Sequence, residues 1–222
     1  MRARFANLLE HEQALWRQGL TRVAGVDEAG CGPLAGPVVA AAVVLPAAWL
    51  ETGMPAELTR LNDSKQLTES KREAFFKILT SHPAIRFAIV SVDVEVIDRI
   101  NIRQAAWRGM DQALGQLAPR PEHALVDGLR IKWLAYPQTA LVKGDARSYS
   151  IAAASVLAKV TRDRKMLDYD RQYPAYGFAE HKGYGTPRHL AAIREHGPCP
   201  IHRRSFAPFR TVAAERDLFG GA

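Results

Sequence analysis

The chain has 222 residues, of which 47% are hydrophobic and 24% charged, and these near-average fractions exclude a disordered chain. Its 30 basic and 23 acidic side chains give a net charge of +7, which favours a polyanionic partner such as nucleic acid. Its two cysteines form no Cys-x-x-Cys pair, and no secretory signal or membrane-spanning run is found, so we expect a cytoplasmic protein without a zinc ribbon.

Apolar, β-branched runs alternate with segments of helical periodicity along most of the chain, which predicts an α/β fold. Strands are expected over 23–27, 37–45, 85–93, 124–127 and 139–142. Helices are expected over 5–17, 68–79, 100–117 and 150–169, with Thr68 as the N-cap of the second. The span 46–62 is loop-like, and the remainder after about residue 170 is expected to wrap the sheet with helices and loops.

Three of the predicted strands lead directly into an acidic residue: Asp27, Asp127 and Asp145. Each acid alone is as well explained as a turn residue, but ligands gather at strand ends in open α/β sheets. Glu28 follows Asp27, and neighbouring side chains on a strand point to opposite faces. Glu28 can therefore serve the same site only if the strand ends there or if its backbone carbonyl takes part.

Four clustered carboxylates repel one another unless a cation lies between them. Mg²⁺ and Mn²⁺ are hard ions that prefer oxygen ligands, and two such ions would balance four carboxylates. One ion can activate a water as nucleophile while the other stabilises the leaving oxygen of a phosphodiester. The acids therefore predict a two-metal nuclease site.

A glycine-rich segment follows the first two acids and reads Gly-Val-Asp-Glu-Ala-Gly-Cys-Gly-Pro-Leu-Ala-Gly-Pro over residues 25–37. Gly30, Gly32 and Ala35 fit the Gly-x-Gly-x-x-Ala pattern of a dinucleotide-binding turn. Pro33 and Pro37 obstruct the helix that such a turn requires, and a strand follows instead. A dinucleotide site is therefore disfavoured.

This segment resembles the first motif of the ribonuclease HII family, the type 2 ribonucleases H. The resemblance continues, in the family's order, through Asp63-Ser64-Lys65, Val126-Asp127-Gly128, Lys143-Gly144-Asp145, the run from Ser150 to Asp163, Tyr176-Gly177-Phe178, His181-Lys182-Gly183-Tyr184 and His202-Arg203-Arg204-Ser205-Phe206. It implies an RNase H-like fold, with a mixed five-stranded sheet flanked by helices and a C-terminal helical lobe. We expect a single domain over 1–222, with the catalytic core at about 22–170 and the lobe and tail at about 171–222.

The resemblance also implies an activity: hydrolysis of the RNA strand of RNA–DNA hybrids, and nicking 5′ of single ribonucleotides in duplex DNA. The products would be a 5′-phosphate and a 3′-hydroxyl, and the role would be removal of ribonucleotides from DNA. The metal ligands and catalytic residues implied are Asp27, Glu28, Asp127 and Asp145, holding two Mn²⁺ or Mg²⁺ ions. A monomer is expected, and a DNA clamp is a conceivable further partner through the tail after Arg210.

The resemblance places substrate contacts mainly beside these acids. Gly30, Cys31 and Gly32 would read the 2′-hydroxyl through backbone groups, and Tyr184 would pack on the deoxyribose beside the cut junction, unless it is a core tyrosine. Cys31 departs from the arginine that is usual in the family, and a thiol cannot replace a guanidinium on a phosphate. We therefore expect a weaker phosphate grip at residue 31.

Further substrate contacts are expected at residues in or near the family motifs: Lys65, Lys143, Ser155 and Lys159. Ser155, Lys159 and Arg162 are spaced four and three apart, so they share one helix face. This face is either a ridge of phosphate contacts or a solvated surface on which Arg162 pairs with an acid. The pattern leaves both interpretations open.

Three other functions are weighed against the residues. A zinc site at His196, Cys199 and His202 is disfavoured because a fourth ligand is not obvious. A resolvase-like DNA nuclease would need no reader for the 2′-hydroxyl, so the glycine segment and Tyr184 argue against it. A non-catalytic hybrid-binding protein would gain nothing from four acids, which repel nucleic acid unless a metal balances them.

Overall fold

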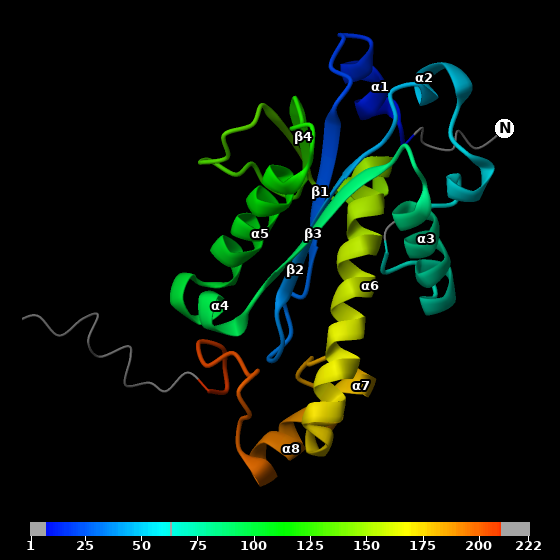
Figure 1. The fold of residues 1–222 in the computed structure, drawn as a ribbon. Coiled ribbons are helices and arrows are strands. Elements are labelled where there is room, and N and C mark those ends of the chain that lie inside the picture. The colour runs from blue at the N-terminus through cyan, green and yellow to red at the C-terminus, as the bar shows by residue number, and fades with distance from the viewer. Residues whose placement is uncertain (1–7, 63, 210–222) are drawn as a thin grey trace, which may run out of the picture.

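A single mixed sheet forms the centre of the computed structural model, which describes residues 8–62 and 64–209 (Figure 1). Its strands lie in the order β3-β2-β1-β4-β5. They are β1 (Val23–Ala29), β2 (Val38–Val44), β3 (Arg86–Val92), β4 (His123–Asp127) and β5 (Gln138–Leu141). β2 pairs antiparallel with β1 and β3, whereas β1, β4 and β5 run parallel. The five predicted strands and the mixed sheet are confirmed.

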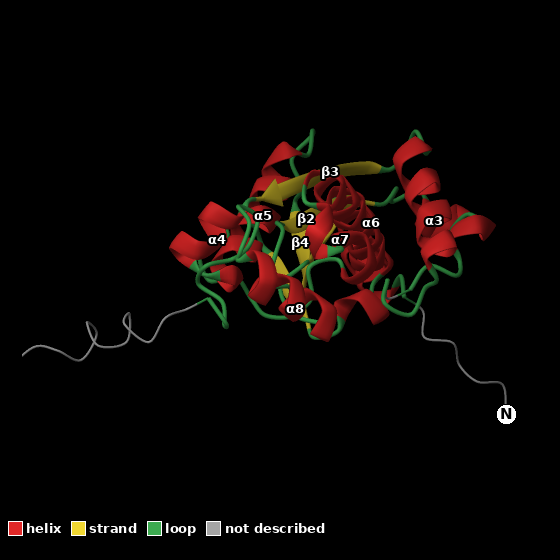
Figure 2. Cartoon of the chain, turned by 90° about the horizontal axis from the view of Figure 1, so that it is seen from below, coloured by secondary structure: helices red, strands yellow, loops and turns green. Residues whose placement is uncertain are grey.

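Helices cover both faces of this sheet, as the view in Figure 2 shows. The long α6 (Tyr149–Gln172) and α3 (Glu69–Ser81) lie on one side, and α4 (Val94–Ile100) and α5 (Ile102–Gln116) lie on the other. The Thr68 hydroxyl accepts a hydrogen bond from the backbone N–H of Lys71, so its predicted capping of α3 is confirmed. Each face of the sheet thus contributes to a separate apolar core.

The helix predicted over 100–117 is present as α5, which begins at Ile102, but two other elements were not predicted. The separate helix α4 ends at Ile100, and Asn101, with a φ of 67°, follows it and caps α5 by accepting from the Gln104 N–H. The loop predicted over 46–62 contains α2 (Trp49–Thr52) and a short 3₁₀ helix. The first predicted helix is present as α1 (Glu10–Trp16), and its residues 5–7 lie outside the described residues, as does Asp63.

The start of α6 is fixed against β1 by close backbone packing. A Cβ atom at Gly25 would lie 2.2 Å from the backbone carbon of Ser150, so only glycine lets the helix approach this strand. The buried carboxylate of Glu12 accepts hydrogen bonds from the hydroxyls of Ser148 and Ser150 and from the Ser150 N–H. A carboxylate at a helix N-terminus is favourable, so α1 holds α6 in register with the sheet.

The C-terminal part forms a lobe at one end of the sheet, with α7 (Phe178–His181) and α8 (Pro187–His196) at the bottom of Figure 1. The rings of Tyr176 and Phe178 stack there with centroids 5.4 Å apart, and the rings of four histidines pack around them. This lobe has an apolar cluster of its own, which includes Met166 of α6.

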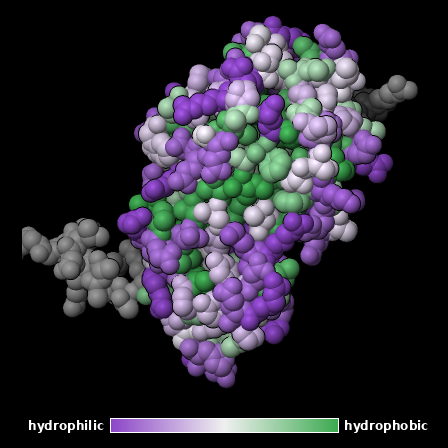
Figure 3. All heavy atoms as spheres, in the orientation of Figure 1, coloured by the Kyte–Doolittle hydropathy of each residue, from purple (hydrophilic) through white to green (hydrophobic). Residues whose placement is uncertain are grey.

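The surface of the face shown in Figure 3 is polar at both ends, with an apolar band across the middle. The band lies over the region where β3, the edge strand, passes between the flanking helices in Figure 1. Within residues 8–62 and 64–209, no helix combines the length and apolar character needed to cross a membrane.

Candidate active site

The predicted acids come from three neighbouring elements. Asp27 and Glu28 lie near the end of β1, Asp127 ends β4, and Asp145 lies in a 3₁₀ turn directly after β5. Asp27 and Asp145 are buried, and the Asp127 carboxylate accepts a hydrogen bond of 2.6 Å from the Gly144 N–H. That hydrogen bond holds the turn carrying Asp145 against the end of β4.

The carboxylates of the first three acids repel one another. Burial raises the pKa of Asp27 well above its usual value, and the charges of Glu28 and Asp127 raise it further. Burial also raises the pKa of Glu28, and Asp127 adds to this. Other groups oppose the rise. Hydrogen bonds from the Glu28 backbone and from Ser155 lower the pKa of Asp27, and the hydrogen bond from Cys31 and then the charge of Lys65 lower that of Glu28.

Glu28 lies at the candidate site although it is the direct neighbour of Asp27 on the same strand. β1 continues to Ala29 and pairs with β2 throughout, so the strand does not end at Asp27 as the sequence suggested. Glu28 lines the main pocket of the site, and its carboxylate accepts a hydrogen bond from the Cys31 thiol, with Sγ and Oε1 3.4 Å apart. Burial and then the charge of Glu28 raise the pKa of that thiol, so Cys31 stays uncharged.

This pocket has a volume of about 280 Å³ and collects most of the predicted substrate residues. Its lining includes Glu28, Gly30, Cys31, Gly32, Lys65, Ser155, Lys159, Arg162 and Tyr184. Tyr184 is 47% exposed and its ring lies beside Gly32, which excludes the reading of a core tyrosine. Lys143 is exposed and does not line the pocket.

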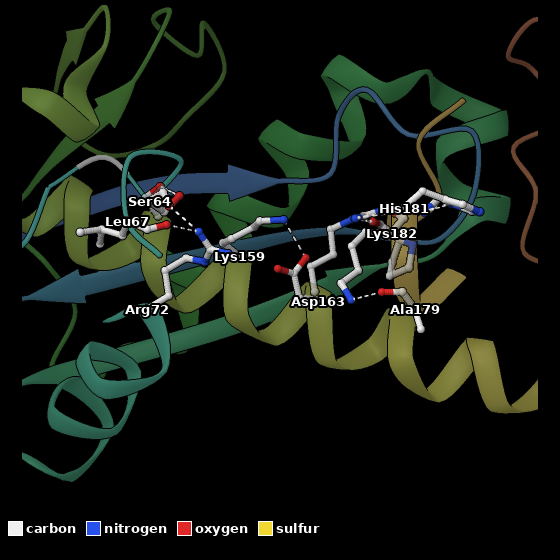
Figure 4. Close-up of polar contacts among 12 residues, drawn as sticks. Ser64, Leu67, Arg72, Lys159, Asp163, Ala179, His181 and Lys182 are labelled. Carbon is white, nitrogen blue, oxygen red and sulfur yellow. Dashed lines mark hydrogen bonds and ion pairs between the residues drawn. The ribbon is translucent and has the colours of Figure 1, made fainter. Parts of the chain in front are cut away.

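The helix face predicted from the spacing on α6 is present, but its members differ in role. Ser155 is buried and shares a hydrogen bond of 2.8 Å with Ser64, a member of the Asp63-Ser64-Lys65 motif to which the sequence assigned no contact. Lys159 pairs with Asp163 at 2.7 Å, as Figure 4 shows. Figure 4 also shows Arg72 of α3 near the carbonyl oxygens of Ser64 and Leu67, to which it donates hydrogen bonds.

Arg162 fits neither of the two interpretations left open by its spacing. Its side chain is 1% exposed, and its guanidinium donates to the carbonyl oxygens of Ala35, Pro37 and Lys182 at 3.0–3.1 Å. It is therefore neither a solvated residue paired with an acid nor a free phosphate contact. A Cβ at Gly30 would lie 2.2 Å from its Nε, so the glycine is required by close packing on this arginine.

A second buried arginine, Arg203, supports the same segment from the C-terminal lobe. It donates to the carbonyl oxygens of Gly30, Cys31, Gly36 and Pro37 at distances from 2.6 to 3.2 Å. Burial, followed by the nearby charge of Arg162, lowers its pKa to about 9. The basic motif around it was noticed in the sequence, but nothing local indicates a contact 172 residues away.

The two arginines fix the direction of the peptide groups in the glycine segment. In a trans peptide the C=O and the following N–H point in opposite directions. Because Arg203 binds the carbonyls of Gly30 and Cys31, the N–H groups of Cys31 and Gly32 point away from it. The segment can therefore present backbone donors to a ligand oxygen in the pocket that it lines.

The carboxylates fit divalent cations by chemistry and charge. Oxygen donors suit Mg²⁺ and Mn²⁺, and a cation would favour the charged form of Asp27 and Glu28, whose pKa values are raised by burial first and then by neighbouring carboxylates. Within the described residues, no three His, Cys, Asp or Glu side chains are already arranged as metal ligands. His196, Cys199 and His202 are likewise not arranged as a set of metal ligands, and the His202 Nδ1 atom lies 3.1 Å from the Cys199 sulfur.

Comparison with solved structures defines the class of the fold. The ribonuclease H2 of Pyrococcus horikoshii superposes with a TM-score of 0.70 at 29% identity, covering 87% of this chain and 97% of that one. A ribonuclease HIII solved with Mn²⁺ gives a TM-score of 0.63 at 20% identity, covering 93% of this chain and 74% of that one. The fold is RNase H-like, as the resemblance implied.

Sequence comparison gives the family. Residues 24–209 match the family model described as Ribonuclease HII. The ribonuclease HII of Geobacter metallireducens is 54% identical over 88% of this chain and 91% of its own length. That of Geobacillus thermodenitrificans is 52% identical over 94% and 77%. The chain belongs to the ribonuclease HII family, and it is a metal-dependent hydrolase with ribonuclease H activity.

Proposed function

We propose that this enzyme cuts the RNA strand of RNA–DNA hybrids and also nicks duplex DNA on the 5′ side of a single ribonucleotide, leaving a 5′-phosphate and a 3′-hydroxyl. One observation carries the proposal: Glu28, whose charge repels that of Asp27, lines the pocket that the glycine segment and Tyr184 also line. A nuclease for DNA alone would not need backbone donors aimed where a ribose hydroxyl enters. The activity would serve to remove ribonucleotides from DNA.

In this proposal Asp27, Glu28, Asp127 and Asp145 hold two divalent ions, Mn²⁺ or Mg²⁺. Such ions supply an activated water and stabilise the leaving oxygen of an in-line displacement. The N–H groups of Cys31 and Gly32 bind the 2′-hydroxyl, and the exposed ring of Tyr184 packs on the neighbouring deoxyribose. Further contacts to the nucleic acid are assigned to Lys65, Lys143, Ser155 and Lys159.

An assay on three duplexes tests the substrate assignment. Labelled duplexes of DNA alone, DNA with one ribonucleotide, and RNA–DNA hybrid are incubated with the enzyme and Mg²⁺ or Mn²⁺. We expect cutting 5′ of the ribonucleotide and along the hybrid RNA, with the DNA duplex intact. Equal cutting of all three duplexes, or an intact ribonucleotide duplex, would overturn the assignment.

The role of the acids is tested by Asp127→Asn. We expect kcat to fall by about a thousandfold or more, because a metal ligand is lost and metal ions supply several kcal/mol of transition-state stabilisation. An Asn oxygen can still accept from the Gly144 N–H, so thermal unfolding should be nearly unchanged. Asp168→Asn, which removes an exposed acid far along α6, is the control and should retain full activity. Retained activity in Asp127→Asn would exclude this carboxylate as a ligand.

The remaining expectations about partners and organisation stay predictions. One structural neighbour, from Archaeoglobus fulgidus, was solved as a complex of PCNA with RNase HII, with a TM-score of 0.67 at 24% identity over 87% of this chain and 99% of that one. A DNA clamp is accordingly retained as a proposed partner of this enzyme. The tail after Arg210, where the contact was expected, lies outside the described residues.

A further inference from the structure

A second pocket lies on the other side of Glu28 and Cys31 from the main one. It has a volume of about 240 Å³, and its lining consists of Glu28, Cys31, Ile102, Arg103, Ala106 and Trp107. The two pockets share Glu28 and Cys31, so these residues form the wall between them. A polymeric ligand that binds over the acids, such as a nucleic-acid strand, can therefore occupy both pockets at once.

The opposite wall of this second pocket is the first part of α5, the helix that covers the other face of the sheet (Figure 2). Arg103 and Trp107 are four residues apart, so they lie on the same side of the helix. Arg103 is exposed, and among the described residues its guanidinium has no hydrogen bond or ion pair. The pocket therefore offers a permanently charged and uncommitted donor.

The chemistry of the lining defines the class of ligand. A guanidinium presents a planar fork of donors that matches a phosphate, and the face of an aromatic ring suits a sugar or a base. Glu28 also lines the pocket, but Cys31 donates to one of its oxygens and the proposed metal ions would balance its charge. Arg103 also lies in the first turn of the 15-residue α5, where the helix dipole adds to the attraction for an anion.

We propose that this pocket binds a backbone phosphate of the cut strand of the nucleic-acid substrate, with Arg103 as the binding cation and Trp107 as an adjoining contact. The proposal rests on the proposed function, because it places the phosphate on the same strand that crosses the acids. It assigns to α5 a part in substrate binding in addition to its part in the core. Arg103 is a binding residue and takes no part in the chemistry.

Binding is measured first, on an Asp127→Asn background so that the substrate stays intact. Fluorescence anisotropy with a labelled RNA–DNA hybrid gives Kd over a range of salt concentrations for this background with and without Arg103→Ala. Arg108→Ala is the matched control, because Arg108 is an exposed arginine of the same helix that does not line the pocket. We expect Arg103→Ala to raise Kd about tenfold and to reduce the slope of log Kd against log salt by about one, the effect of one phosphate contact.

Kinetics on the otherwise unchanged enzyme complete the test. Arg103→Ala should raise KM with little change in kcat, Arg103→Lys should recover part of the loss, and Arg108→Ala should match the parent enzyme. Equal salt slopes for Arg103→Ala and Arg108→Ala would overturn the proposal. So would a fall in kcat at unchanged KM, which would mean that Arg103 acts on Glu28 rather than on substrate. If the parent cuts no hybrid, the proposed function fails, while the salt slope still decides whether Arg103 binds a phosphate.

Discussion

Cys31, like Glu28, lines both pockets and so influences the shape of the proposed substrate path. Its thiol is held uncharged by burial and by the neighbouring Glu28, so it contributes neither a cation nor an anion to either pocket. Residue 31 is therefore expected to bind phosphate weakly, and binding of the phosphate depends on other side chains. Arg103 lines the second pocket together with Cys31.

Cys31→Arg should strengthen substrate binding. A guanidinium at this wall would add a charge-assisted contact of roughly 1.5 kcal/mol, which corresponds to about a tenfold lower KM. Steady-state kinetics on the hybrid and on the single-ribonucleotide duplex measure the effect. Cys31→Ser, which changes no charge, is the control and should behave as the parent enzyme does. Equal KM values for Cys31→Arg and Cys31→Ser would contradict the prediction.

Much of the acid set could be predicted at this scale. The strand ends identified Asp27 and Asp127 because strand periodicity and the acid after it are local features. The position of Glu28 could not be predicted, since it depends on how far β1 extends and on its pairing with β2. Both interpretations of Arg162 were wrong because both assumed an accessible guanidinium, whereas the carbonyl oxygens that it contacts come from segments 20 and 125–127 residues away.

At the level of elements, the glycine segment 30–37 is held by its surroundings more than by its own sequence. Besides the two arginines, Leu34 exchanges backbone hydrogen bonds with Gly183 and Arg203, and the Gly36 N–H donates to Ile201. The N–H donors proposed to read the 2′-hydroxyl thus depend on the C-terminal lobe for their orientation.

Arg203→Lys should loosen this segment while keeping the positive charge. A lysine cannot reproduce the fork that reaches four carbonyl oxygens, so buried acceptors would lose partners at a cost of about 2–3 kcal/mol. We expect a lower urea midpoint and a smaller preference for ribonucleotide-containing over plain DNA duplexes. Arg204→Lys alters the exposed neighbour and is the control. A lower midpoint with an unchanged preference would show that the arginine serves stability alone.

The helices and strands were largely predictable because they follow from local sequence patterns, whereas the path of the glycine segment depends on residues far away in the sequence. Strands and helices follow from hydrophobic periodicity over ten or so residues, and the five strands and the long α6 were found in this way. The helix α4 was missed because it is only seven residues long and ends at an asparagine with positive φ, which leaves no trace in that periodicity. The capping of α6 by Glu12 joins residues 136–138 apart and is equally invisible to local patterns.

At the scale of the whole molecule, the C-terminal lobe is packed around buried histidines. His189 and His202 have their Nε2 atoms 3.0 Å apart, and His181 stacks on His189. Burial lowers the pKa of His202 to about 4, and the charges of His189, Arg204 and His181 act in the same direction, against a hydrogen bond to the backbone of Cys199. Burial likewise lowers the pKa of His189. The lobe therefore packs around neutral imidazoles.

Stability should fall as the solution is acidified. Between pH 6.5, near the unfolded pKa of histidine, and pH 4, the folded pKa of His202, the unfolded chain binds more protons than the folded one. The stability contributed by this neutral histidine is complete above pH 6.5 and is lost as the pH falls towards 4, by up to about 3 kcal/mol.

Urea unfolding at pH 7.5 and pH 5.0 measures this loss. The difference between the two pH values should be smaller in His202→Gln, which cannot take up the proton. His11→Gln, in α1, replaces a histidine outside the lobe and should leave the difference unchanged. Equal unfolding free energies for the parent enzyme at the two pH values would contradict the prediction.

The two buried arginines also bear on how such a site can vary between relatives. The path of the segment that carries residue 31 is set by guanidinium groups that contact its carbonyl oxygens, and a carbonyl is the same whatever side chain accompanies it. Residue 31 can therefore exchange one side chain for another without changing the course of the backbone. Recognition of the sugar and binding of the phosphate are then separable properties. A substitution at residue 31 changes the binding of the phosphate and leaves the recognition of the sugar as it is.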